Sequence, residues 1–536
     1  MGITRRRENL YCAAFSLLFG FCHCYLYLVE KDVLHGKWGA AILMADVVVS
    51  GIVCFLFLTR LALPWVARTA QRAEVWTAET NRRSDVKYFL LVALVLFLLW
   101  VPVFLAYYPG IFAYDVYAQI PLRYTTHHPL LHTLYLQFFY YIVGKHWAGD
   151  PSTGIAAASL VQMALFSLMI SFTHLYLRKV GVRKRYRALL VAFTGIFPVF
   201  PMMAISTTKD ILFAGIFAVL FTLLCWRRTF ADAAVGRKWY AVLYVLAVAG
   251  VILMRNNGLY PVLGLTACLV AAARKSKTDR KLLCYTVAGL LIGGAVNAGL
   301  QYGLQAEPGS KNEMLNVPYQ QIACAYQDNK EDMTDAEKAA IIEILPDVER
   351  YNPYISDNIK ATARGADNIE DLLTVYLQTG MKYPQSYLKG FFRLNGGYLS
   401  IVDTTVARVY YGEESAYRIG IIPSFIQAGF GVTRESRLPV LENLYEKLFT
   451  NNDYQYVFGL NLLCSPALYL WLTILLAFCC AVQKVPGTAP MFSFLFVLIL
   501  TLFAGPCVLV RYALPYILCL PPLAACVQRT RTLAAV

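Results

Sequence analysis

Charged residues are scarce in this sequence, and their scarcity excludes several classes of protein. Only 15% of the 536 residues are Asp, Glu, Lys or Arg, whereas 58% are hydrophobic. Soluble globular domains carry about 25% charged residues, so an ordinary soluble enzyme and a disordered chain are both excluded. A fibrous protein is excluded as well, because no internal repeat or low-complexity tract is present. Since the hydrophobic excess lies in long apolar runs, the composition predicts an all-α polytopic membrane protein.

A disulfide framework is also missing. Most of the 14 cysteines lie inside apolar runs, where cysteine packs as a small hydrophobe. The one large polar region, residues 305–457, contains only Cys324. The motif Cys22-His23-Cys24 has the residue types of a metal-binding pair, but its position among aromatic residues in an apolar run favours packing. No glycine-rich nucleotide-binding motif is present either.

Twelve segments are apolar enough to span a membrane, although several are shorter than the ~20 residues that a straight span requires. The first segment follows Arg5-Arg6-Arg7 without a clear small-residue cleavage site, so we expect a retained anchor rather than a signal peptide. The expected spans are residues 10–29, 39–59, 88–107, 153–177, 188–204, 210–226, 239–254, 258–273, 282–304, 458–482, 489–510 and 512–528.

The basic residues set the expected orientation. None of the 48 Lys and Arg residues lies inside the twelve segments. With a cytoplasmic N-terminus, 27 of them lie in segments assigned to the inside and only 7 in the short outside loops. This agrees with the positive-inside rule and predicts that both termini are cytoplasmic. It also requires that residues 129–144 do not cross, because crossing would place six cations between Arg178 and Arg187 outside. We therefore expect a helix on the outer membrane surface there.

The polar region 305–457 is predicted to be an inserted extracytoplasmic, mainly helical domain. It holds 21 acidic and 14 basic residues, so the remaining chain carries a net charge of +22. That positive charge is expected in the cytoplasmic loops, where it faces anionic lipid. The basic composition therefore does not indicate a nucleic-acid partner. The pattern from Thr334 to Glu337 is a capping box that predicts a helix to about Leu345, and residues 366–380 offer a second amphipathic helix. The other expected parts are residues 1–60, with two helices, the core 88–304 with its first outer loop 108–152, and the C-terminal helices 458–536.

Polar and ionisable side chains collect in the short loops that are expected to face outside. Each loop carries one or two such groups at a helix end, which suggests a cavity that opens to the outside. A carboxylate among aromatic residues can act as a general base, so Asp115 is the candidate catalytic residue. The candidate substrate-binding residues are Gln119, His127, His128, Lys209, Asp210, Arg255, Asn256, Asn257, Arg511 and Tyr512.

Each of these residues also has a plain structural interpretation. Asp115 could be an N-cap or a surface acid, and the adjacent histidines could be interfacial residues rather than ligands of a phosphate or a metal. Lys209 and Asp210 could form an internal salt bridge with a helix cap. Isolated arginines on the outside need an anionic partner, which is either a substrate phosphate or a lipid headgroup. One acid and three isolated cations at one face suit the transfer of a group from a lipid phosphate, whose leaving charge Arg or Lys can stabilise.

The pattern resembles the GT-C superfamily of polytopic glycosyltransferases, which use polyprenyl-phosphate-linked sugars. A catalytic acid lies in the first outer loop of their core, the place of Asp115 here, and that loop continues into a surface helix, as expected for residues 129–144. The acidic pattern that many members show in the second outer loop is reduced here to Asp210. The element Arg511-Tyr512-Ala513-Leu514-Pro515 is similar to an Arg-Tyr-x-x-Pro element near the last spans of several members.

The sequence looks closer still to an uncharacterised family of large bacterial polytopic membrane proteins, a match that specifies no substrate. Spans one and two look like additions to the core. The segments that carry this resemblance are Tyr108-Pro109-Gly110 with Asp115 and Gln119, His127-His128-Pro129, Lys209-Asp210, Arg255-Asn256-Asn257-Gly258, Pro318-Tyr319-Gln320-Gln321-Ile322-Ala323, and Tyr351-Asn352-Pro353 with Ser356-Asp357.

These resemblances imply a glycosyltransferase of the cell membrane. A single base and a phosphate leaving group suit inversion at the anomeric carbon, whereas a covalent route would need a second carboxylate, which Asp210 could supply only if it lies close to Asp115. The donor would be a polyprenyl-phosphate-linked sugar and the acceptor a cell-envelope glycan, lipid or protein. Some relatives use a divalent metal, which only Asp115, Asp210 and the histidines could hold here. The alternative is a transporter or flippase of lipid-linked glycans, which predicts ionisable groups near mid-bilayer and broken helices. Only Asp46 is expected at such a depth. A non-catalytic envelope assembly protein is a third hypothesis.

Overall fold

The computed structural model is almost entirely α-helical. It describes residues 2–30, 38–69, 82–112, 116–230, 235–401, 409–410, 416–417, 430–450, 454, 457 and 459–533. Within these ranges, the only paired strands are β1 (Val409–Tyr410) and β2 (Ala416–Tyr417), which are antiparallel. Seven described helices are long and apolar enough to cross a membrane, and three shorter apolar helices accompany them. The protein is therefore an all-α membrane protein, as its composition predicts.

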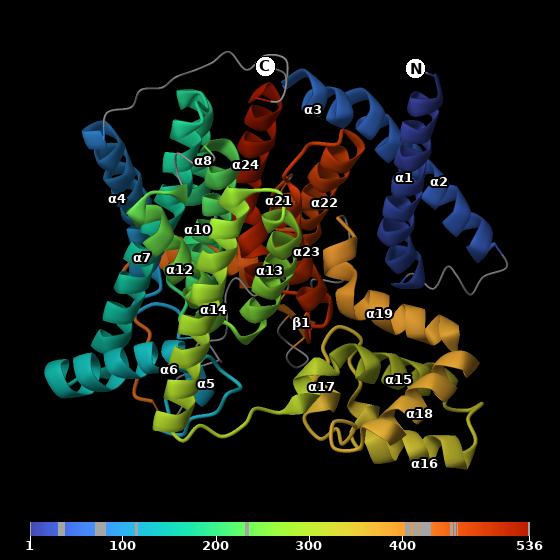
Figure 1. Cartoon of the computed structure of the whole chain (residues 1–536). Helices are drawn as coiled ribbons and strands as arrows, with labels where there is room; N and C mark the ends of the chain where they lie inside the picture. Colours follow the sequence, from blue (N-terminus) through green and yellow to red (C-terminus); the bar gives the residue numbers. More distant parts are fainter. Residues whose placement is uncertain are drawn as a thin grey trace.

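The membrane bundle is built around α10 (Lys209–Phe230). Helices α7 (Pro151–Lys179), α12 (Lys238–Met254) and α24 (Val510–Leu533) pack directly against it (Figure 1). Nearly all of its apolar stretch is buried, as expected for a helix that is hydrophobic on every side. The other helices of the bundle are α4 (Arg82–Ala106), α13 (Leu259–Ala273), α14 (Lys277–Gly303), α22 (Pro466–Val482) and α23 (Ala489–Phe503).

Helices α1 (Gly2–Glu30) and α2 (Gly39–Phe57) pack against each other beside the bundle (Figure 1), and α2 continues through η2 (Leu58–Ala62) into α3 (Leu63–Thr69). Cys22 packs in a cluster with Phe392 and Trp471, while His23 Nδ1 accepts a hydrogen bond of 3.4 Å from the Ile401 amide. Among the described residues, no group of three or more His, Cys, Asp or Glu could hold a metal ion. Asp46 is exposed on α2, away from the interior of the bundle.

Three of the expected spans are not continuous helices. The predicted span 188–204 divides into α8 (Lys184–Ile196) and α9 (Val199–Ala204), because Phe197 is extended at ψ 121° before Pro198. A residue before proline is disfavoured in the α region, so a helix usually ends there. The same effect at Ser465 separates α21 (Leu460–Leu463) from α22. The predicted span 489–510 ends early at Phe503, and a turn leads from there into α24.

The segment expected on the membrane surface is a helix that is inclined to α7 (Figure 1) and packs against its first turns. It comprises α6 (Leu130–Gln137) and its π-helical continuation η3 (Phe138–Ala148), and it follows the short α5 (Val116–Gln119). This helix is not among the described helices that are apolar enough to span. Whether it lies along the membrane surface stays a prediction.

Residues 311–399 form a helical unit with its own hydrophobic core. Its core includes Tyr319, Ile322, Ile344 and Leu372. The predicted capping box is present, with Thr334 and Glu337 in reciprocal hydrogen bonds, and the helix that it begins ends at Ile344. The elements are η5 (Lys311–Met314), α15 (Asn316–Asn329), α16 (Asp335–Ile344), η6 (Val348–Arg350), α17 (Asp357–Lys360), α18 (Ile369–Lys382) and α19 (Pro384–Leu399).

The later part of the predicted region 305–457 packs elsewhere. The amide of Glu435 donates to the Tyr108 carbonyl (2.9 Å) and that of Arg437 to the Leu105 carbonyl (2.8 Å), so this segment lies against the end of α4. It continues into α20 (Pro439–Tyr445) and η7 (Glu446–Thr450). Residues 430–450 therefore belong with the first loop rather than with the core of the helical unit.

The capping box makes the stability of α16 depend on pH. Hydrogen bonds from Lys382 and from the Thr334 amide lower the pKa of Glu337 from its ordinary 4.5 to about 2. Because the folded-state pKa is depressed, the stabilisation is complete above pH about 4.5 and is lost as the pH falls towards about 2. We expect hydrogen-exchange protection of the α16 amides, corrected for intrinsic rates, to decline over this range. Glu337→Gln should remove this decline and Glu343→Gln should not, and equal responses of the two variants would refute the cap as its cause.

Candidate functional site

Three helix ends converge on the buried carboxylate of Asp210. Asp210 lies in the first turn of α10, Arg255 follows the last residue of α12, and Arg511 lies in the first turn of α24. Arg255 Nη1 is 2.8 Å from Asp210 Oδ1, and Arg511 Nε is 3.2 Å from Oδ2. The side chains of Asp210, Arg511 and Arg255 are 1%, 4% and 14% exposed, so Arg255 is the most accessible of the three. The carboxylate is thus held between two guanidinium groups.

Aromatic rings surround these guanidinium groups. The Arg255 guanidinium lies 4.5 Å from the centre of the Tyr512 ring and 5.6 Å from that of Phe213, and the Arg511 guanidinium lies 5.2 Å from the Tyr512 ring. Cation–π attraction of this kind is strengthened where water is excluded. Two arginines face one carboxylate, so the cluster carries one net positive charge. A phosphate is an anion that such a cluster can bind.

The loop that holds the two histidines is fixed above this cluster. Asn256, which follows Arg255, donates from Nδ2 to the carbonyl oxygens of Thr126 (2.8 Å) and His127 (3.2 Å). Lys209, which precedes Asp210, has its Nζ 3.1 Å from His128 Nδ1. The neighbours of the ion-paired residues therefore position the loop, and they bring the two histidines to the charged cluster.

The first loop is joined by backbone hydrogen bonds to the segment that precedes α10. The Ile111 amide donates to the Ile205 carbonyl (2.9 Å), and the Thr207 amide donates to the Ile111 carbonyl (3.0 Å). Gly110 has φ +116°, and an added Cβ would lie 2.2 Å from Ser159 Oγ, so a side chain does not fit there. This pairing brings residues 110–112 within a few residues of Lys209. Asp115 itself lies outside the described residues.

Gln119 belongs to a separate buried polar group in the same loop. Its Nε2 lies 3.1 Å from His132 Nδ1 and donates to Thr133 Oγ1 at 3.1 Å, and its backbone carbonyl accepts from Gln137 Nε2 at 3.0 Å. This group fastens α5 to α6, which supports the shape of the loop. Gln162 of α7 has a similar role, because its Nε2 donates to the carbonyls of Ala204 (2.9 Å) and Ser206 (2.7 Å).

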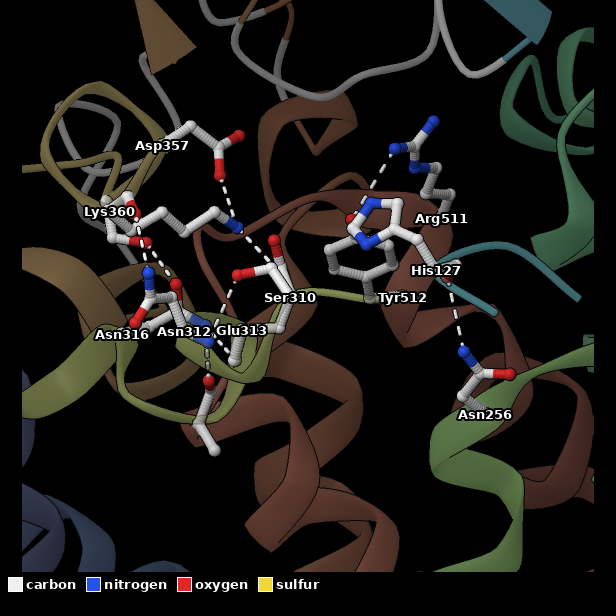
Figure 2. A network of polar contacts seen from close by, with 12 residues as sticks. His127, Asn256, Ser310, Asn312, Glu313, Asn316, Asp357, Lys360, Arg511 and Tyr512 are labelled. Carbon is white, nitrogen blue, oxygen red and sulfur yellow. Dashed lines mark hydrogen bonds and ion pairs between the residues drawn. The ribbon is translucent and has the colours of Figure 1, made fainter. Parts of the chain in front are cut away.

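The helical unit contacts the turn that leads to Arg511. Figure 2 shows the polar side chains at this junction, with Asn316 on the side of the unit and Arg511 beyond the turn. The Ser356 amide donates to the Pro506 carbonyl (3.0 Å), and Asn316 Nδ2 donates to the Ala504 carbonyl (3.0 Å). Ile355 packs in one apolar cluster with residues of this turn and with Tyr512. The unit therefore supports the turn from which the arginine projects.

A largely buried lysine, Lys360, ties the helical unit together at this junction. Lys360 Nζ is 2.6 Å from Glu313 Oε2 and 2.7 Å from Asp357 Oδ1 (Figure 2). Burial alone lowers the pKa of Lys360, but the two carboxylates outweigh it and the pKa lies above its ordinary value. The lysine is therefore a charged, structural link between η5 and α17.

One family model matches the chain over residues 120–534, and its description is a family of unknown function (DUF6020). The chain belongs to this family. The matched residues include all the members of the charged cluster and the histidine loop, whereas Asp115 and Gln119 precede them. No curated protein and no solved structure matches the chain.

The structure brings most of the sequence candidates together. His127, His128, Lys209 and Asn256 lie around the Asp210 cluster, and Asn257 Nδ2 donates to Thr501 Oγ1 (3.1 Å) beside it. Gln119 contacts a different group. Sequence reasoning did not include Gln137, Gln162, Phe213 or the Thr126 carbonyl among the candidates. The sequence does contain a signal for Gln137 and Gln162, because each is a polar residue within an apolar helix.

The described residues do not fit a divalent metal. Both oxygens of Asp210 face guanidinium groups, which would repel a cation at the same place. His128 Nδ1 already lies against the Lys209 ammonium.

Removal of the central carboxylate should be far more harmful than removal of one arginine. Asp210→Asn leaves two buried guanidinium groups without a counter-charge, and breaking a buried ion pair costs about 3–5 kcal/mol. Arg255→Gln leaves the balanced pair of Asp210 and Arg511, so we expect a smaller loss. Thermal unfolding of the purified full chain in detergent measures the loss of stability in both variants. Equal tolerance of the two substitutions would show that the cluster does not carry the stability assigned to it.

Proposed function

We propose that this protein is a membrane glycosyltransferase of about twelve spans that contains a GT-C-like core. It would transfer a sugar from a polyprenyl-phosphate-linked donor to a cell-envelope acceptor at the outer face of the membrane. Both termini would then be cytoplasmic and the helical unit extracytoplasmic. The observation that supports this proposal most is the net positive cluster of Asp210, Arg255 and Arg511 at converging helix ends, beside the first loop.

The cluster suits the phosphate of a lipid-linked donor. Its surplus positive charge lies at one end of the bundle, where a lipid phosphate could enter from the membrane. Arg255 is the most accessible of the three, so it would contact the phosphate, while Asp210 and Arg511 hold it in place. The charge that develops on the departing phosphate is stabilised by groups already in position, which reduces the barrier to transfer. Lys209 lies one residue from Asp210 and adds a further cation.

Asp115 would act as the general base. It would accept the proton of the acceptor hydroxyl while that oxygen forms a bond to the anomeric carbon. The bond from that carbon to the phosphate oxygen breaks at the same time, and the lipid phosphate leaves with the electron pair. A single base opposite the leaving group inverts the anomeric configuration. The described flanks, Phe112 and Val116, are fully buried, and Ile111 is hydrogen-bonded beside the start of α10.

The structure contains one feature that the transporter hypothesis also requires. The chain is broken between α8 and α9 at Phe197 and between α21 and α22 at Ser465, and broken helices are typical of transporters. Each break is explained by the proline that follows it, however, and Phe197 and Phe200 place apolar rather than ionisable groups at the first one. The mid-span acid Asp46 is exposed on α2 and does not line the bundle. We therefore favour the transferase.

An activity assay with a panel of polyprenyl-phosphate sugars and envelope extract tests this proposal. The purified wild-type chain should release or transfer sugar, and Asp115→Asn should lower the rate by about 10²–10⁴-fold, the usual contribution of a general base. The loss should be in kcat, because Asp115 does not bind the donor phosphate.

Two acid-to-amide variants serve as controls. Glu307→Gln removes an exposed ion pair with Arg123 in the same part of the chain, and Asp46→Asn removes the mid-span acid; both should keep full activity. Loss of function in Asp46→Asn with retention in Asp115→Asn would instead favour a transporter. Absence of turnover with every donor, despite intact donor binding, would refute the transferase.

A further inference from the structure

Three sulfur atoms meet inside the bundle, at the end of α10 that lies opposite Asp210. They belong to Cys225 of α10, Met491 of α23 and Cys526 of α24, which together are called the sulfur cluster here. Cys225 is fifteen residues from Asp210 along α10, which corresponds to about 22 Å at 1.5 Å per residue. The sulfur cluster is therefore separate from the proposed donor site.

The sulfur atoms lie at the separation that a shared metal ion requires. Met491 Sδ is 3.6 Å from Cys225 Sγ and 3.9 Å from Cys526 Sγ. The side chains of the two cysteines also interact directly with each other. Around a metal ion with sulfur bonds of about 2.3 Å, three sulfurs in one plane lie about 4 Å apart. The ion would occupy the centre of this triangle, so it requires only small shifts of the sulfurs and no separate cavity.

Hydroxyl groups next to the sulfur cluster position its two cysteines. Thr229 Oγ1 donates to the Cys225 carbonyl (2.9 Å), and it lies 3.8 Å from Cys526 Sγ and 2.8 Å from Tyr176 Oη. Indirect contacts of this kind orient the ligands of metal ions in proteins. Packing as small hydrophobes explains why single cysteines are buried, but it does not require three sulfurs from three helices to meet.

We propose that Cys225, Met491 and Cys526 bind a soft monovalent metal ion, Cu(I). Thiolate and thioether sulfurs are the ligands that select Cu(I), whereas zinc is held by cysteine, histidine and carboxylate side chains. The described residues contain no group of three or more His, Cys, Asp or Glu that could hold a metal, so a zinc site is not favoured at this place. The methionine is thus the ligand that makes the sulfur cluster specific for a soft ion.

The charge of the bound state can be offset by a neighbouring arginine. Binding of Cu(I) displaces one proton from each thiol into solvent, because cysteine coordinates a metal as the thiolate. Two thiolates, one neutral thioether and Cu(I) carry one net negative charge. The guanidinium of Arg228 interacts electrostatically with Cys526 and would offset this charge. Under the proposed orientation this end of α10 would face the cytoplasm, where thiols are kept reduced.

Copper titration of the purified full chain tests the site. The detergent-solubilised protein is kept reduced and anaerobic, and Cu(I) is offered in competition with the chelator bicinchoninate. We expect the wild type to retain one Cu(I) per chain against the chelator, and X-ray absorption at the copper edge to show only sulfur neighbours. Bound Cu(I) should also raise the unfolding temperature, because a ligand that binds only the folded state stabilises it. None of these measurements depends on transferase activity.

Matched variants make each result decisive. Cys225→Ser and Cys526→Ser should each abolish binding that resists the chelator, because a hydroxyl is a poor ligand for a soft ion. Cys464→Ser removes a buried cysteine just before α22 and should bind Cu(I) like the wild type. Should the serine variants fail to fold, Met491→Leu preserves the side-chain volume and removes only the thioether. It should lower the affinity more than tenfold, since loss of even an indirect partner of a metal ligand costs about 10–100-fold.

Three outcomes would overturn the proposal. The first is a folded wild type that yields all of its Cu(I) to the chelator. The second is equal affinity in the wild type and Met491→Leu, or a loss in Cys464→Ser as large as that in Cys225→Ser, because either would show that Cu(I) binds to cysteines elsewhere. The third is a disulfide between Cys225 and Cys526 in the freshly isolated chain, found by peptide mapping, since the oxidised sulfurs could not act as thiolate ligands.

Discussion

The ion pairing of one buried carboxylate with two arginines is the contact on which this end of the bundle depends. An isolated carboxylate or guanidinium would be very unfavourable at these burials, so the three side chains require one another. Their distances of 2.8 and 3.2 Å bring the ends of α10, α12 and α24 together. Because one positive charge remains, the contact that assembles the helices also creates the place where an anion can bind.

The loops around the cluster are positioned by residues adjacent to it in sequence. Asn256 follows Arg255 and holds the carbonyls of the histidine loop, and Lys209 precedes Asp210 and contacts His128. A displacement of the ion pair would therefore move the loop as well. This coupling explains how a few polar residues at helix ends define a single charged site.

The helical unit is linked to the same site through backbone contacts. Ser356 and Asn316 hold the carbonyls of the turn before α24, and Ile355 packs near Tyr512. A ligand that binds the unit would consequently act on the turn that carries Arg511. Under the proposed function, acceptor binding by the unit and phosphate binding by the cluster are thus mechanically connected.

Composition and local patterns were enough to establish the class of protein and several elements. Hydrophobic runs predicted the membrane helices, and the Thr334–Glu337 pattern predicted α16, because both signals act within a few residues. The break at Phe197 was missed although Pro198 signals it, since hydropathy ignores backbone restrictions. The sequence also placed polar groups at the right helix ends, but it left the partners of Asp210 open. Those partners come from helices far apart in the chain, so only helix packing could decide which charges meet.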